Sequence, residues 1–134
     1  MKLLILCVDR DDDLGSKAGI ESPVIGREDC LKAAMALGLT DPEETDTNSI
    51  FSGISVYDDY IKNGVEAEIA VICGDKDVGI KSDQILAKQM DIVLGRVEPK
   101  SAILVSDGAD DEYIYPLLAY SCTMINIITL FELA

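Results

Sequence analysis

A run of apolar residues that ends abruptly in aspartate is the feature that most constrains the fold of this chain. Residues 3–8 are continuously apolar rather than alternating, and Asp9 follows them directly. A continuously apolar strand is typical of a parallel sheet that helices cover on both faces. Two more strands are expected at residues 67–73 and 102–105, which also run into aspartate-containing loops, and a last strand is expected at residues 125–131.

Segments with helical spacing separate these expected strands. Their apolar residues recur at steps of three and four, which places them on one buried side of a helix. Capping residues and helix terminators suggest where each helix begins and ends. A long loop is predicted over residues 10–26. Helices are predicted over residues 28–37, ending at Gly38, from Asp46 or Thr47 to residue 63, from Ser82 to residue 97, and over residues 113–121. In the last of these helices, Pro116 would fit only in the first turn.

The alternation of strands and helices predicts the fold class. We expect a single α/β domain over residues 1–134, three-layered and Rossmann-like, with a mostly parallel sheet of about four strands. A chain of 134 residues that is 49% apolar is long enough to close one such core. One alternative is a membrane span, because residues 114–130 contain no charged side chain and approach the required length.

Net charge and cysteine content narrow the possible environments and partners. The chain has 25 acidic and 11 basic residues, and its formal charge of −14 repels nucleic acid and disfavours it as a partner. The four cysteines are far apart and histidine is absent, which disfavours disulfides, zinc sites and His-based catalytic triads. The sequence therefore predicts reduced thiols and a cytoplasmic location.

Acidic residues gather where the predicted strands end. Residues 9–13, 75–77 and 107–112 hold ten of the 25 acids within 14 positions. Such crowding costs Coulomb energy unless a cation neutralises it or the side chains splay into water as solvated loop residues and helix caps. Carboxylates without histidine suit Mg²⁺ or Mn²⁺. The candidate metal ligands are Asp9, Asp11, Asp12, Asp75, Asp77 and Asp107.

A phosphate-containing small molecule is the natural companion of such an ion. Mg²⁺ usually binds through a few carboxylates and completes its shell with water and substrate oxygens. Basic residues and glycines lie in or beside the same loops, and the candidate ligand-binding residues are Arg10, Lys17, Gly74, Lys76, Gly108 and Asp110. No complete catalytic motif occurs, so if the domain is an enzyme, metal-dependent phosphoryl transfer or phosphoester hydrolysis is the class that its residues permit.

Four strings in fixed order carry a resemblance to a known family. They are LCVDRDDDLG at residues 6–15, SPVIGRE at 22–28, CGDKDVG at 73–79 and VSDGADDE at 105–112. With these strings the chain resembles the uncharacterised archaeal proteins catalogued as domain of unknown function 373. The resemblance implies an archaeal origin and no established activity.

Members of that family typically continue into predicted transmembrane helices. The resemblance therefore implies that this chain is either the soluble N-terminal domain of a longer membrane protein or a short member. It also implies an alternative function, a non-catalytic sensor or assembly domain on the cytosolic face of a membrane. A two-fold homodimer is the default expectation for the oligomeric state.

Overall fold

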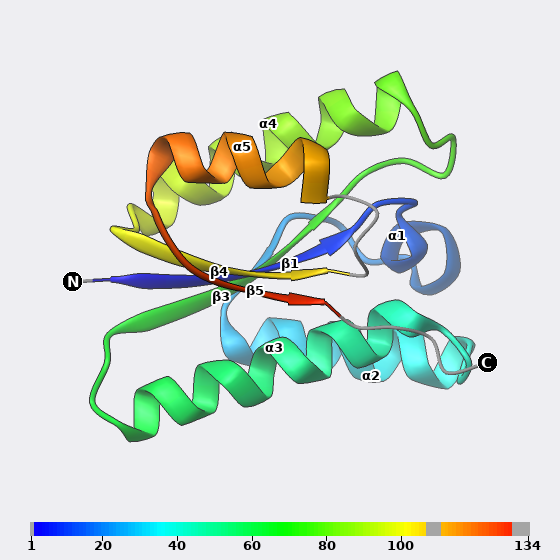
Figure 1. Ribbon diagram of the computed structural model, residues 1–134. Helices are drawn as coiled ribbons and strands as arrows, with labels where there is room; N and C mark the ends of the chain where they lie inside the picture. Colours follow the sequence, from blue (N-terminus) through cyan, green and yellow to red (C-terminus); the bar gives the residue numbers. More distant parts are fainter. Residues whose placement is uncertain (1, 107–110, 130–134) are drawn as a thin grey trace.

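The computed structural model describes residues 2–106 and 111–129 and shows an α/β fold in which helices cover both faces of a central sheet (Figure 1). Helices α4 and α5 lie on one face, and α2 and α3 lie on the other. In chain order the elements are β1 (Leu3–Asp9), α1 (Asp13–Ala18), β2 (Val24–Ile25), α2 (Arg27–Thr40), α3 (Thr45–Lys62), β3 (Ala67–Cys73), α4 (Ile80–Val97), β4 (Ser101–Ser106), α5 (Asp111–Ser121) and β5 (Thr123–Thr129).

The sheet is mixed, which corrects the expectation of a mostly parallel sheet. Its strand order is β2-β3-β1-β4-β5. Strand β1 runs parallel to β3 and β4, and β4 runs parallel to β5, but the two-residue strand β2 pairs antiparallel with β3. The reversal arises because the chain leaves β1 at its carboxyl end and turns back along the outer side of β3.

Strand β1 is central and buried along its whole length, which explains its unbroken apolar sequence. Leu3, Ile5 and Cys7 belong to a core cluster shared with α2 and α3. Leu4 and Leu6 point to the opposite face and pack in a second cluster with α4 and α5. The expectation that helices cover both faces is therefore confirmed for this strand.

Several predicted helix boundaries are wrong. Gly38 does not end α2, and the absent Cβ instead allows close packing of α3, because an added Cβ would lie 3.2 Å from the Thr47 methyl carbon. Helix α3 is capped by Glu44, whose carboxylate accepts the Asp46 N–H, and not by Asp46 or Thr47. Ser82 lies inside α4 rather than at its start. Pro116 lies in the middle of α5 rather than in its first turn.

The loop predicted between residues 10 and 26 contains two short elements, α1 and β2. The apolar stretch 114–130 is divided between α5 and β5, as far as it is described. Within the described ranges no helix has both the length and the apolar character that crossing a bilayer requires.

Candidate metal centre

The carboxyl end of β1 is built around the side chain of Asp9. This residue is only 1% exposed, and its Oδ1 and Oδ2 accept the N–H groups of Asp13 and Leu14 at 3.0 and 2.9 Å. Between them, Asp12 adopts a left-handed conformation with φ of 57°, and its Oδ1 accepts the Gly15 N–H at 3.0 Å. The two aspartates thus hold the tight turn that starts α1, because short polar side chains tolerate this conformation and satisfy free N–H groups.

Four carboxyl groups converge beside this turn. Asp9 ends β1, Asp11 lies in the turn that follows, Asp13 begins α1, and Asp46 comes from the first turn of α3. Each offers an oxygen that lies within 4.8 Å of the others. Asp13 and Asp46 are 7% and 8% exposed, whereas Asp11 reaches solvent.

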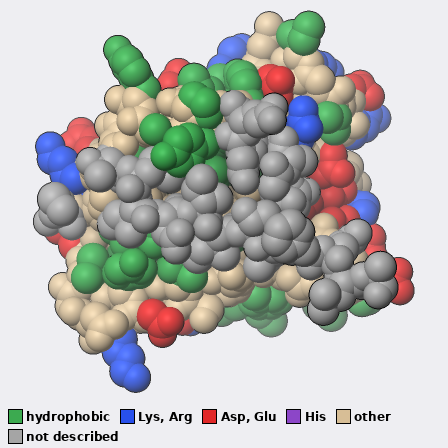
Figure 2. Space-filling view, viewed as in Figure 1, with side chains coloured by type: hydrophobic (Ala, Val, Ile, Leu, Met, Phe, Trp, Pro, Cys, Tyr) green, Lys and Arg blue, Asp and Glu red, His purple; other side chains and the backbone are tan. Residues whose placement is uncertain are grey.

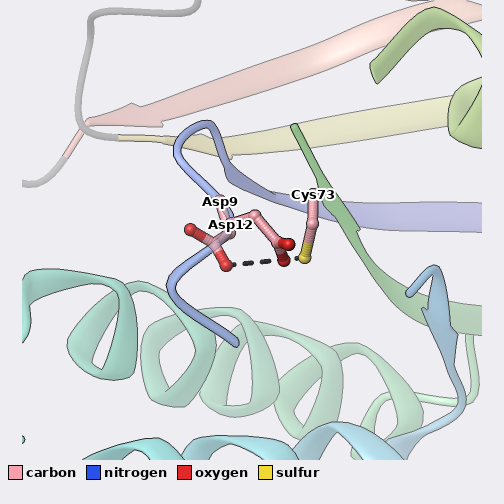
Figure 3. Close-up of side chains that lie close together, drawn as sticks. All are labelled: Asp9, Asp12 and Cys73. Atoms are coloured by element: carbon pink, nitrogen blue, oxygen red, sulfur yellow. Dashed lines mark hydrogen bonds between the residues drawn. The ribbon is translucent and has the colours of Figure 1, made fainter. Parts of the chain in front are cut away.

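A second group of possible ligand atoms shares Asp9. The side chains of Asp9, Asp12 and Cys73 lie together at the adjoining ends of β1 and β3 (Figure 3). The wholly buried Cys73 thiol donates to Asp9 Oδ2 across 3.5 Å. The two strands bring them together because Asp9 and Cys73 are partners in the parallel register.

Burial sets the electrostatics of the four carboxyl groups. It raises the pKa of Asp46 far above the usual range of a carboxyl, and the contacts with Asp13 and Asp9 raise that pKa further. Burial also raises the pKa of Asp13 to about 7. For Asp9, burial raises the pKa although the N–H groups of Leu14 and Asp13 oppose the shift. Without a cation, the geometry therefore favours protons held among these groups.

Lys17 supplies positive charge at the edge of this cluster. Its ammonium group lies 3.6 Å from Asp13 Oδ1, 2.6 Å from Glu44 Oε2 and 2.9 Å from Asp41 Oδ2. The sequence suggested Lys17 as a contact for an anionic ligand, which stays a prediction, and the structure places its ammonium group among three carboxylates. Figure 2 shows acidic and basic side chains together on the side of the molecule where Figure 1 places α1.

The loop after β3 approaches the same strand end through its backbone. The Gly74 N–H donates to the Asp9 carbonyl oxygen at 2.9 Å, and the Asp75 N–H donates to the Arg10 carbonyl oxygen at 3.2 Å. The Ser82 hydroxyl also donates to that Arg10 oxygen, at 2.6 Å. This network holds the β3 loop against the turn that follows β1.

The charged side chains of this second loop lie outside both ligand groups. The Asp75 carboxylate is 3.6 Å from the Lys81 ammonium and accepts the Asp77 N–H at 3.2 Å. Asp77 and Lys76 are exposed, and an Arg10 guanidinium nitrogen lies 3.9 Å from Asp83 Oδ1. The predicted residues Asp107, Gly108 and Asp110 lie outside the described part of the chain.

Sequence reasoning did not select Asp13, Asp46 or Cys73 as ligands. Asp13 stands four residues after Asp9 in the acidic string, so a helical turn at that point would have suggested it. Cys73 is the last residue of a predicted strand, where side chains of neighbouring parallel strands meet. Asp46 was interpreted as a possible helix cap, and no local signal in the sequence indicates its burial.

Comparisons with known proteins agree with the resemblance seen in the sequence. The family model described as Domain of unknown function (DUF373) matches residues 2–128. An uncharacterized protein of Archaeoglobus fulgidus is 48% identical over 118 residues, which cover 88% of this chain and 34% of that protein. An uncharacterized protein of Methanocaldococcus jannaschii is 44% identical over 116 residues, covering 86% of this chain and 32% of that protein.

The chain thus spans about a third of the length of the curated relatives that it matches. No solved structure matches it. Because the family model covers nearly the whole chain, this protein belongs to the archaeal family described as Domain of unknown function (DUF373).

Proposed function

We propose that this domain binds a divalent cation through Asp9, Asp11, Asp13 and Asp46. The observation that carries the proposal is the buried carboxyl group of Asp46. Among the described residues its side-chain hydrogen-bonding partners are the carboxyl groups of Asp13 and Asp9, and no ammonium or guanidinium group forms an ion pair with it. A buried carboxylate without positive charge is costly, and an ion at the meeting point of the four groups removes that cost.

The ligand atoms favour Mg²⁺ or Mn²⁺ at this position. All four groups are carboxylates, and hard divalent cations prefer oxygen ligands. Asp9 and Asp13 are held in place by β1 and α1, whereas the exposed Asp11 has freedom to adjust. Such an arrangement leaves part of the coordination shell to water or to a second ligand.

A phosphate-containing small molecule is the ligand class that we propose for that open part. We further propose that the domain is doubly wound and Rossmann-like around its parallel strands. In support, the chain passes from β1 to β3 on one side of β1, and β4 lies on the other side of β1. The strand order therefore reverses next to Asp9. Ligands of such sheets bind outside the carboxyl ends of the strands at that reversal. Arg10 and Lys76 in the surrounding loops, and Lys81 in the first turn of α4, carry positive charge for an anion.

Calorimetric titration of Mn²⁺ into the metal-free protein tests the cation site. We expect the wild type to bind and Asp46→Asn to lose at least tenfold in affinity, since the amide keeps the shape but removes the charge. Asp59→Asn is the matched control, because Asp59 is exposed on the same helix and the change in charge is identical. Equal affinities for the two variants would show that Asp46 does not hold the ion.

Turnover of phosphoesters decides between the two functions that we consider. Metal-dependent hydrolysis of a phosphoester panel, reduced in Asp46→Asn and retained in Asp59→Asn, supports an enzyme of the phosphoryl-transfer or phosphohydrolase type. Binding of Mn²⁺ and inorganic phosphate without turnover supports the alternative, a non-catalytic sensor or assembly domain. If no ion binds at millimolar concentration, the proposed cation site is wrong.

A further inference from the structure

We propose that Asp9 bridges two cations, and that the second ion is a thiophilic one held by Asp9, Asp12 and Cys73. This inference rests on the proposed function, because the two ions share Asp9. It adds a second site of different chemistry, since one of its three ligand atoms is sulfur rather than oxygen.

The free lone pairs on the two carboxylate oxygens allow Asp9 to bind one cation through each oxygen. Each carboxylate oxygen has two lone pairs, and the N–H groups of Asp13 and Leu14 use one on Oδ1 and one on Oδ2. One lone pair remains on each oxygen. The Cys73 thiol donates to Oδ2, so an ion that displaces the thiol proton to solvent finds sulfur and oxygen directed at one position.

The distance between these two atoms fits a tetrahedral ion. With Zn–S of about 2.3 Å and Zn–O of about 2.1 Å, tetrahedral angles place sulfur and oxygen about 3.6 Å apart. The Cys73 sulfur and Asp9 Oδ2 are 3.5 Å apart. Asp12 supplies a third ligand oxygen, and one oxygen of each aspartate and the sulfur lie within 4.8 Å of one another. Three protein ligands leave the fourth position open to water or to an oxygen of a phosphate-containing ligand, as in catalytic zinc sites.

Hydrogen bonds with two polar side chains, Gln89 and Ser22, surround Cys73. The side-chain oxygen of Gln89, a residue that is 9% exposed, accepts the Cys73 N–H at 2.8 Å, and its amide nitrogen donates to Ser22 Oγ at 2.7 Å. With its oxygen engaged as an acceptor, the Ser22 hydroxyl is available to donate to the Cys73 sulfur. Burial raises the pKa of the Cys73 thiol, and this contact with Ser22 opposes the shift. A donor of this kind stabilises a thiolate ligand and fixes its orientation.

Titration of the metal-free protein with Co²⁺ tests the second site, because Co²⁺ bound to thiolate absorbs in the near ultraviolet. We expect two ions per wild-type chain and a thiolate-to-metal band. Cys73→Ser should bind one ion and lose the band, whereas Asp46→Asn should bind one ion and keep it. Cys122→Ser is the matched control and should behave as the wild type, since Cys122 is half-buried and lies in neither ligand group.

X-ray absorption at the zinc edge of the Zn²⁺-loaded wild type gives a second measurement that needs no variant. We expect one sulfur scatterer at about 2.3 Å. If an ion binds in an Asp46-dependent way but no sulfur ligand is found, the proposed function stands and the second ion is wrong. If no ion of any kind binds, both proposals are wrong.

Discussion

The carboxyl group of Asp46, in the first turn of α3, makes hydrogen-bonding contact with that of Asp13, in the first turn of α1. The contact joins two helices whose N-termini both carry partial positive charge, which offsets part of the repulsion between carboxylates. Two acids in contact also need a shared proton or a cation. Four predictions follow from this contact and from the packing that produces it.

Asp46→Asn should stabilise the metal-free protein. In the folded, metal-free protein Asp46 keeps a proton at a pH at which the unfolded chain has lost it, and the amide removes the cost of taking up that proton. We therefore expect the free energy of unfolding at pH 8 to rise by about 1–3 kcal/mol. Urea denaturation in the presence of a chelator measures this change. Asp59→Asn should shift the midpoint little, because Asp59 is exposed. A loss of stability in Asp46→Asn would mean that the Asp46 carboxylate is already compensated.

The metal-free wild type should lose stability as the pH rises from about 4 to 8. Burial raises the folded-state pKa values of Asp13, to about 7, and of Asp46 above those of the unfolded chain. The folded state therefore holds more protons than the unfolded chain throughout this range, and the free energy of unfolding falls as the pH rises. Chemical denaturation at several pH values measures the slope, which should be smaller in Asp46→Asn.

Saturating Mn²⁺ should reverse that dependence on pH. The ion replaces the shared protons, so its affinity rises as the carboxyl groups ionise. At one hundred times the dissociation constant, binding to the folded state alone adds about 2.7 kcal/mol to stability. Thermal unfolding with and without Mn²⁺ at pH 5.5 and pH 8 provides the comparison. A larger gain at the lower pH would contradict the exchange of protons for metal.

Lys17→Met should tighten the binding of Mn²⁺ severalfold. The Lys17 ammonium lies 3.6 Å from Asp13 Oδ1, so removing it makes the cluster more negative. Lys32→Met is the control, since it also removes an exposed ammonium from a helix, one that lies 3.5 Å from Glu28. Calorimetry at low ionic strength should separate the two variants. Equal effects would indicate a general charge effect rather than a local one.

The main strands were predictable because their apolar runs are local. The runs at residues 3–8, 67–73 and 102–105 became β1, β3 and β4 with ends shifted by at most one residue. Asp9, expected directly after the first strand, is the last residue of β1 and is buried. Local signals thus located the end of β1 as the candidate site.

The composition of the ligand groups was not predictable, because it depends on contacts between distant segments. Helix α3 approaches β1 closely at Gly53, where an added Cβ would overlap the Cys7 sulfur and lie 3.3 Å from Ile69 Cδ1. This approach lets α3 bring Asp46 to the turn after β1. No spacing in the sequence indicates how closely a helix approaches a strand. Helix α1 was missed for a related reason, since Asp9 and Asp12 hold its first turn within an apparent loop.

The two hydrogen bonds that the Asp9 carboxylate accepts from backbone N–H groups offer a way to detect an ion at the site. Any ion that draws electron density from the Asp9 carboxylate weakens its hydrogen bonds to Asp13 and Leu14. Those two amides therefore act as spectroscopic reporters, and their proton resonances should move together as the site fills. Because Asp9 terminates the central strand, the same pair of signals registers events at either ligand group without a label or an assay for activity.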